Sequence, residues 1–466
     1  MNLEFNDLDV PSALGLSIVA VISTMPAISF AQVQKSSLSI AESTKQLNYL
    51  IELALMGDTM RSQYAAQSQA IRESGVASAT LMDPKLKVGF GGLPVDSFKF
   101  NEDPMTNISV GIMQQFERGA TLDLNQRKAN QQADSVAYQV QVRERVVANN
   151  ITQLWLELGY LQFAESIIIE NHRLMLEMEQ YVQTNYSIGK SEAQDLLNIQ
   201  LQANKLDEKL QSNRQMQNRV VAQLSEWLGS EWINSRSVDS NQAVYQLDWS
   251  RLDTLLEQQI NNTQYYALLN QHPMAQIADA NISVNRTQVE VAEQSYTPQF
   301  SVEVMYAYRQ SDNMMGEPAS DLLSAYLTMD IPLFTDNRQD KNVAAAQYQV
   351  GAAQYQKDTL IAQMNAQVNA LMTDRMNFTE RIERYQERLL PQSKVRIEAV
   401  ERGYQNNTTQ LADVISASND ELALQVELAR LITDLNQTNS KLASLLGGFE
   451  YQITAPNAQY QNRVKQ

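Results

Sequence analysis

Few side chains in this 466-residue chain are arranged as catalytic or metal-binding residues would be. The two histidines, His172 and His272, are isolated and lack a partner cluster, so the sequence predicts no histidine metal site. The absence of cysteine excludes disulfides and thiolate metal ligands. The sequence contains no glycine-rich phosphate loop and no recognisable arrangement of nucleophile and base. We therefore expect a protein that is not an enzyme and needs no cofactor.

Methionine is the remaining candidate metal ligand. The 18 methionines include an adjacent pair, Met314 and Met315, in a segment that we expect to be an external loop. Exposed thioethers can bind soft Cu(I). Methionine also fills irregular gaps in packing, which is the favoured interpretation here. The sequence leaves a metal site undetermined.

Two carboxylates, Asp195 and Asp413, lie at the start of long helix-permissive segments. A carboxylate in the first turn of a helix interacts favourably with the helix dipole, and this alone could explain both residues. Whether they also share a functional site depends on the elements that position them.

Asp195 belongs to a stretch from Gly119 to Leu228 that has no proline and only Gly159 and Gly189 as internal glycines. Apolar residues recur in it every seven positions, which keeps one side of a helix facing a partner helix. These residues are Val140, Val147, Leu154, Leu161, Ile168 and Met175, with Ile151 and Leu158 beside them. A polar turn at 185–190 divides the stretch, and Gly189 suits the positive φ of a helix end. The pattern predicts a long α-hairpin with a small polar tip.

The same hairpin occurs a second time, shifted by 218 residues. The shift relates four landmarks: Tyr186 to Tyr404, Asp195 to Asp413, Phe116 to Phe334, and Leu228-Gly229 to Leu446-Gly447. We predict a second α-hairpin at 336–446, with its tip from Tyr404 to Thr408. Pro391 lies within its first long helix, where it should produce a kink.

Apolar and polar residues alternate in the two segments that precede the α-hairpins, 84–117 and 298–333. Each segment predicts a β-hairpin with strands of about ten residues, enough to cross a bilayer when tilted. A half-buried soluble sheet has the same period, but the flanking helices are too polar to provide these hairpins with a core. Four strands cannot close a barrel, and lipid does not tolerate open sheet edges. The chain must therefore oligomerise if the strands span a membrane, and three copies would supply twelve strands.

The predicted organisation has five parts. They are a signal peptide (1–31), a first repeat (32–229, with its β-hairpin at 84–117 and α-hairpin at 119–228), an equatorial insertion (230–270), a second repeat (271–447, with its β-hairpin at 298–333 and α-hairpin at 336–446) and a polar C-terminal tail (448–466). Each repeat opens with a helical pattern, from Ser39 to Ala79 and from Pro273 to Tyr296. The signal peptide rests on the short apolar block 13–25 and the small residues before 32, although acidic residues precede the block. A buried N-terminal helix is the alternative.

The order of helix, β-hairpin and long α-hairpin, present twice, resembles the TolC-like outer-membrane efflux factors over nearly the whole mature chain. Resemblance to the heavy-metal branch (CusC/CzcC-like) is carried by Asp83-Pro84-Lys85-Leu86, Leu93-Pro94-Val95-Asp96-Ser97, Met105 and Gln114-Gln115-Phe116. The second tip, Tyr404 with Leu411-Ala412-Asp413-Val414, also resembles the family. The resemblance implies a mixed α and β membrane protein in which three copies form a 12-stranded transmembrane β-barrel continuous with a periplasmic α-helical tunnel. It places the protein in the outer membrane of a Gram-negative bacterium, in contact with lipid.

The resemblance also implies partners and site residues. The partners are a periplasmic adaptor (membrane fusion) protein and an inner-membrane pump, expected to be proton-driven. The periplasmic gate would involve Asp195, Tyr404 and Asp413, and three copies of a carboxylate brought close by symmetry would repel and could bind a cation. The adaptor-docking residues would be Tyr186, Gly189, Lys190, Asn407 and Thr408. Thr409 and Ser416 depart from the family pattern, so we expect the closing contacts to differ here.

These features predict a passive outer-membrane exit duct of a tripartite efflux system, with heavy-metal ions as a candidate cargo. An exit duct for drugs or secreted polypeptides is an alternative. A non-channel coiled-coil envelope scaffold is an alternative of a different class. The net charge of −17 and the lack of a Lys/Arg run argue against a nucleic-acid partner.

Overall fold

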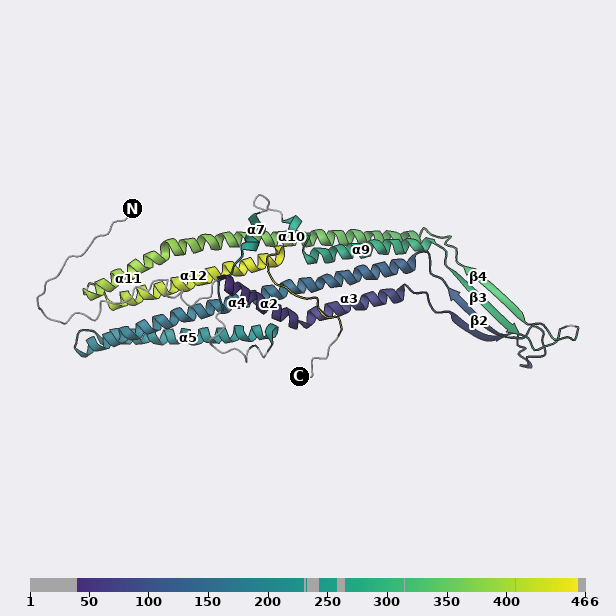
Figure 1. Cartoon of the computed structure of the whole chain (residues 1–466), viewed down its shortest axis with the longest axis horizontal. Coiled ribbons are helices and arrows are strands. Elements are labelled where there is room, and N and C mark those ends of the chain that lie inside the picture. Colours follow the sequence, from purple (N-terminus) through teal and green to yellow (C-terminus); the bar gives the residue numbers. More distant parts are fainter. Residues whose placement is uncertain are drawn as a thin grey trace. The chain divides into compact units, whose positions relative to one another are not determined.

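Long helices and one small sheet make up the computed structural model (Figure 1). It describes residues 40–229, 232, 243–257, 265–313, 315–406 and 408–459, which all lie in one unit from Ile40 to Gln466. The first-half elements are α2 (Ile40–Gly57), α3 (Thr59–Ser78), β1 (Lys85–Gly91), β2 (Asn107–Gln115), α4 (Thr121–Ser187) and α5 (Ala193–Leu228). The second-half elements are α7 (Ser250–Glu257), α8 (Tyr266–Leu269), α9 (Pro273–Glu293), β3 (Phe300–Tyr308), β4 (Leu322–Met329), α10 (Gln339–Arg384), α11 (Leu390–Gln405) and α12 (Leu411–Leu446). The expected signal peptide at 1–31 lies outside the described residues, as do Met314 and Asn407.

The segment from Ser39 to Ala79, predicted to be helical, forms two helices rather than one. Asp58 separates α2 from α3, and its side chain caps α3 by accepting a hydrogen bond from the Met60 N–H at 2.7 Å. The same carboxylate pairs with Arg143 of α4 at 2.6 Å. The break therefore depends on a partner more than eighty residues away along the chain.

The two α-hairpins keep the 218-residue shift in their helix bounds. α5 and α12 are both 36 residues long, beginning at Ala193 and Leu411. Each ends at a glycine with positive φ, 82° at Gly229 and 94° at Gly447. The shared start and stop signals explain why helices of different sequence have equal length.

The first long helix of each hairpin differs between the repeats. α4 is continuous, whereas a π-helical turn, Tyr385–Leu389, separates α10 from α11. Pro391 has no N–H to offer the carbonyl of Glu387, and the π-helical turn just before it absorbs this misfit. The kink predicted at Pro391 takes this form, and the ribbon bends there in Figure 1.

The strands form one antiparallel sheet in the order β1-β2-β3-β4, because β2 of the first β-hairpin pairs with β3 of the second. The register aligns Val88 with Val110, Val110 with Tyr306 and Tyr306 with Leu323. Directly paired residues point to the same face. This apolar sheet face comprises Leu86, Val88, Phe90, Ile108, Val110, Ile112, Phe300, Val302, Val304, Tyr306, Tyr308, Leu323, Leu327 and Met329, all exposed. Within the described unit, nothing buries it.

The strands are shorter than predicted, with 7, 9, 9 and 8 residues. β4 ends at Met329, although alternation predicted that it would reach Ile331. Pro332 follows, and it restricts the residue before it and cannot donate to a sheet. None of the described helices is long and apolar enough to cross a membrane.

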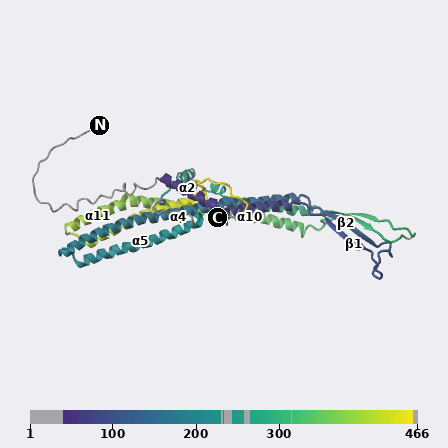
Figure 2. The same ribbon diagram turned by 60° about the horizontal axis from the view of Figure 1, so that its bottom comes forward.

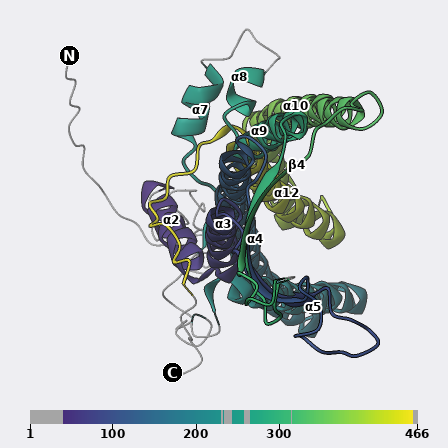
Figure 3. The same cartoon turned by 90° about the vertical axis from the view of Figure 1, so that its right-hand side faces the viewer.

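The helices lie side by side in rows. Toward the sheet, α3 packs on α4, α4 on α9 and α9 on α10, as seen from the sheet end in Figure 3. Toward the tips, α5 packs on α4, α4 on α12 and α12 on α11 (Figure 2). Within α4 the predicted apolar seam is buried at Val147, Ile151, Leu158, Leu161, Ile168 and Met175. The rows leave α3 and α5 at one edge, and α10 and α11 at the other.

The largest apolar clusters lie near the middle of the long helices. One joins α2, α4 and α5 through residues such as Ile51, Trp155 and Leu224. A second joins α7, α8, α10 and α12, and Phe449 packs against both clusters. The core is therefore concentrated at the level of the insertion, and the tips and the sheet project from it.

Candidate functional site at the hairpin tips

The first tip is a tight polar turn between α4 and α5. Gly189 has φ of +75°, and its N–H donates to the Tyr186 carbonyl at 3.0 Å. The Lys190 N–H donates to the Asn185 carbonyl at 2.8 Å. These bonds satisfy carbonyls that the helix end would leave free. Tyr186, Gly189 and Lys190 are exposed, so the turn presents an aromatic ring and a cation outward.

The second tip, between α11 and α12, closes differently. The Thr408 N–H donates to the Gly403 carbonyl at 2.8 Å, and the Thr409 hydroxyl donates to the Val400 carbonyl at 3.0 Å. A side chain on Gly403 would meet the Thr409 methyl group at 2.7 Å, so this close approach requires glycine. Thr408 is exposed, and Asn407 lies outside the described residues. Thr409, which departs from the family pattern, is therefore part of the turn itself.

Asp195 and Asp413 have the same local role in the two repeats. Each is the third residue of its helix and takes part in a capping box. Asp195 Oδ2 accepts from the Glu192 N–H at 3.4 Å, and Asp413 Oδ2 accepts from the Gln410 N–H at 3.1 Å. Helix N-terminal capping, one of the two interpretations of these carboxylates, is thus present in the structure. Asp413 remains exposed and Asp195 is half-buried.

Tyr404 connects the two tips. Its half-buried ring packs against a small cluster formed by Val182, Ile199, Leu411 and Ile415, which belong to both hairpins. The ring lies edge-on to Tyr181 of α4, with centroids 6.4 Å apart. The Tyr404 hydroxyl lies beside Ser191, and burial together with nearby Tyr181 and Asp195 raises the pKa of that hydroxyl.

The structure therefore brings together Tyr404 and Asp195 of the predicted gate and adds Tyr181 and Ser191. Sequence reasoning missed these two because neither repeats at the 218-residue shift. The only sequence feature that could have indicated Tyr181 as a contact of Tyr404 was its position about one and a half helical turns before the tip.

A second group of polar residues lies near the middle of the helices, far from the tips. Arg61 of α3 is 3% exposed and pairs with Glu144 of α4 at 2.6 Å. Arg145 of α4 donates to the Ser444 carbonyl at 3.1 Å. His272 caps α9, where its Nδ1 accepts from the Met274 N–H at 3.1 Å.

Burial, with the nearby Arg145 charge, lowers the pKa of His272 to about 4. The imidazole is therefore neutral at neutral pH, as its role as an acceptor at the α9 cap requires. The Arg61–Glu144 pair joins α3 to α4, and the Arg145–Ser444 hydrogen bond joins α4 to α12.

The described residues offer little for a metal ion. No three His, Asp or Glu side chains among them lie close enough to hold one. His172 has a single carboxylate partner, Asp207, at 3.2 Å. Met315 is 88% exposed in the loop between β3 and β4.

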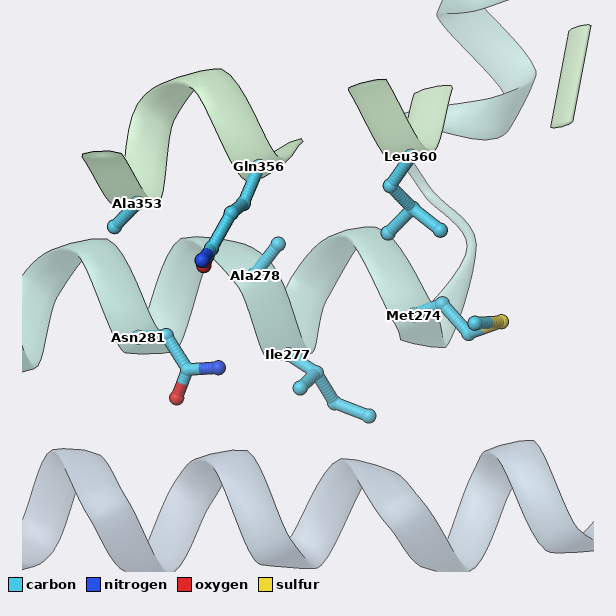
Figure 4. A pocket seen from close by; sticks show the side chains of 7 residues that line it. All are labelled: Met274, Ile277, Ala278, Asn281, Ala353, Gln356 and Leu360. Atoms are coloured by element: carbon cyan, nitrogen blue, oxygen red, sulfur yellow. The ribbon is translucent and has the colours of Figure 1, made fainter. Parts of the chain in front are cut away.

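A shallow groove runs along the surface between α9 and α10 (Figure 4). It is lined by Met274, Ile277, Ala278, Asn281, Ala353, Gln356 and Leu360. The lining is mostly apolar, and a neighbouring hollow on α10 extends it to Tyr355 and Thr359. The groove therefore belongs to the exposed edge of the helical row rather than to an enclosed ligand site.

Comparison with known proteins identifies sequences and structures that resemble this one. Residues 264–448 match the family described as Outer membrane efflux protein. The matched region is 185 of the 466 residues long. This region covers the second β-hairpin and the second α-hairpin, whose elements recur in the first half at the 218-residue shift. No curated protein sequence matches the chain.

Solved structures share the fold over most of the chain. The outer membrane protein VceC of Vibrio cholerae has a TM-score of 0.69 and 14% identity, covering 87% of this chain and 96% of its own. CusC, studied for transmembrane channel formation, has a TM-score of 0.70 and 15% identity, covering 88% and 93%. The Campylobacter jejuni outer membrane channel CmeC has a TM-score of 0.66 and 13% identity, covering 95% and 94%. The likeness in fold to these solved structures therefore extends over both halves of the unit.

Proposed function

We propose that this protein is the outer-membrane exit duct of a tripartite efflux system in a Gram-negative bacterium. Three copies would form a 12-stranded transmembrane β-barrel continuous with a periplasmic α-helical tunnel. A periplasmic adaptor protein and a proton-driven inner-membrane pump would deliver the cargo, since the sequence contains no glycine-rich phosphate loop. The match of residues 264–448 to outer membrane efflux proteins supports this proposal.

The apolar sheet face is the observation that carries it. Val88 is 72% exposed, Leu323 76% and Leu327 71%, and the face continues across all four strands. An uncovered apolar surface of this kind marks contact with a partner or with a membrane. The sheet also has two free edges, β1 and β4, which lipid would not tolerate. Pairing β4 of one copy with β1 of the next would remove both edges.

The helical rows support a closed tube. Their edges carry exposed residues of the kind that pack between neighbouring helices. Tyr348 and Tyr355 of α10 are 82% and 75% exposed and lie seven residues apart, which is the spacing of a helix seam. The opposite edge offers smaller side chains on α3, such as Ala70 and Ser74, which are also exposed. Large residues on one edge and small residues on the other suit contact between adjacent copies.

We propose that the hairpin tips form the periplasmic gate and the adaptor-docking site. Tyr404, packed on Tyr181 and with its hydroxyl beside Ser191, would hold the two tips together in the closed state. Asp195 and Asp413 would cap their helices and, repeated by threefold symmetry, add negative charge around the aperture. The exposed residues Tyr186, Gly189, Lys190 and Thr408, together with Asn407, would meet the adaptor.

The proposed cargo is heavy-metal ions. Support comes from the local resemblance to the heavy-metal branch and from the net charge of −17, which would favour cations in the tunnel. Deleting the gene should lower growth on copper, silver, zinc or cadmium more than growth on dyes and detergents. Equal tolerance of metals in mutant and parent would remove this cargo and leave the duct for drugs or secreted polypeptides.

The particle mass, measured with and without detergent, tests the duct itself. A trimer that is extracted from the outer-membrane fraction and precipitates without detergent is expected, because the apolar sheet face must be covered. A water-soluble monomer or dimer would contradict the duct and favour a coiled-coil envelope scaffold.

A further inference from the structure

The loop between β1 and β2, residues 92–106, holds a phenylalanine in an unusual conformation. Phe98 has φ of +53° and is the only non-glycine residue with positive φ among those the structure describes. The left-handed region is strained for a bulky side chain and persists only where the surroundings impose it. The Phe98 N–H donates to the Pro94 carbonyl at 2.9 Å, which closes a tight local turn. The ring is nevertheless 67% exposed, so the strained turn presents a large apolar group outward.

The exposed apolar surface continues from the sheet into this loop. Phe90, near the end of β1, belongs to the apolar sheet face and is 64% exposed. The Phe100 ring lies edge-on to it, with centroids 5.9 Å apart. Val95, between them in the loop, is 82% exposed. The loop therefore folds beside the apolar face and adds further apolar groups at its outer end.

β1 is too short to span the apolar band of a membrane without this extension. β1 has 7 residues, the shortest strand of the sheet. At about 3.3 Å per residue and a tilt of about 40°, it covers roughly 18 Å of membrane thickness, whereas an outer-membrane barrel presents an apolar band of about 25 Å. At β1, several ångströms of the band must come from residues beyond the strand.

We propose that Val95, Phe98 and Phe100 form an apolar anchor that inserts among the acyl chains of the outer leaflet. The partner that the anchor contacts is lipid hydrocarbon. The same loop carries Lys99 and Glu102, which pair at 2.7 Å and would stay at the level of the head groups. An apolar side beside a charged side is the pattern of a segment that lies at a membrane interface. This inference rests on the proposed function, because the anchor needs a sheet that spans the membrane.

The absence of cysteine makes the test direct, because a single introduced cysteine is the only thiol in the chain. Phe98→Cys carries a nitroxide spin label, and the full-length protein is reconstituted in phospholipid vesicles. Collision of the label with oxygen, which concentrates in hydrocarbon, is compared with collision with a water-soluble nickel complex. Val88→Cys reports on the apolar sheet face, and Asp96→Cys is the matched polar position in the same loop. Each variant is first checked for the parental particle mass.

We expect a several-fold higher ratio of oxygen to nickel collision at positions 88 and 98 than at position 96. A label at position 98 that meets nickel as often as position 96, while position 88 remains in lipid, would overturn the anchor and leave the barrel intact. A label at position 98 shielded from both reagents would overturn it in favour of contact with a neighbouring copy. Nickel access at position 88 would contradict the proposed barrel itself. The two failures are therefore distinguishable.

Discussion

Replacing Tyr404 with phenylalanine tests whether the contact between the two hairpin tips keeps the proposed duct closed. The change removes the hydroxyl, which lies beside Ser191 and is expected to hydrogen-bond to it in the closed duct, and it leaves the ring in place against Tyr181. The half-buried ring and the small apolar cluster beneath it should pack as before. The substitution therefore isolates one hydrogen bond between α11 and the first tip.

The expected effect is multiplied by symmetry. A hydrogen bond of this kind contributes about 1 kcal/mol of net free energy. If three copies open together, three such bonds are lost, or about 3 kcal/mol. Because each 1.4 kcal/mol corresponds to a factor of ten, the open fraction should rise by roughly a hundredfold. Single-channel recording in planar bilayers measures that fraction directly.

The repeat supplies the control. Tyr186 is the counterpart of Tyr404 at the 218-residue shift, but it is exposed at the first tip. Tyr186→Phe should leave the open fraction unchanged. The reasoning is refuted if Tyr404→Phe conducts like the parent, or if both variants open to the same extent.

Three further predictions concern stability in detergent, measured by thermal unfolding. The pKa of His272 is about 4 in the folded protein and 6.5 in the unfolded chain, so the unfolded chain binds the proton more tightly. The free energy of unfolding should therefore fall by about 3 kcal/mol as the pH drops from 6.5 to 4, and His272→Gln should show a smaller fall. Gly159→Ala should destabilise the fold by about 1–3 kcal/mol, since its new methyl group would lie 2.2 Å from the backbone of the facing insertion. The control Gly351→Ala lies in open space and should stabilise the fold by about 0.5–1 kcal/mol. Equal shifts in the two variants would contradict the close approach at Gly159. Arg61→Met should cost about 3–5 kcal/mol by leaving Glu144 without its partner, and adding Glu144→Gln should recover most of it; no recovery would show that packing dominates.

The sequence determined the repeating features of this protein. The seven-residue seam of α4 and the alternation of the strands are periodic. Such a period can be read locally because helices and strands impose it on their own side chains. The shift of 218 residues related the turns and the capping aspartates of the two hairpins before any contact was known. The start of α9 at Pro273 and the misfit at Pro391 also follow from local backbone chemistry.

Tertiary structure decided the features that depend on distant partners. The break at Asp58 needs Arg143, and the neutral state of His272 needs burial beside Arg145. Tyr404 packs against Tyr181 on the other hairpin, and the pairing of β2 with β3 joins two apolar strips into one face. Phe98 has an ordinary sequence context, and its strained, exposed conformation follows from the way the loop closes. These contacts join residues far apart in the chain, and one sequence records which residues occur but not which of them packing brings together.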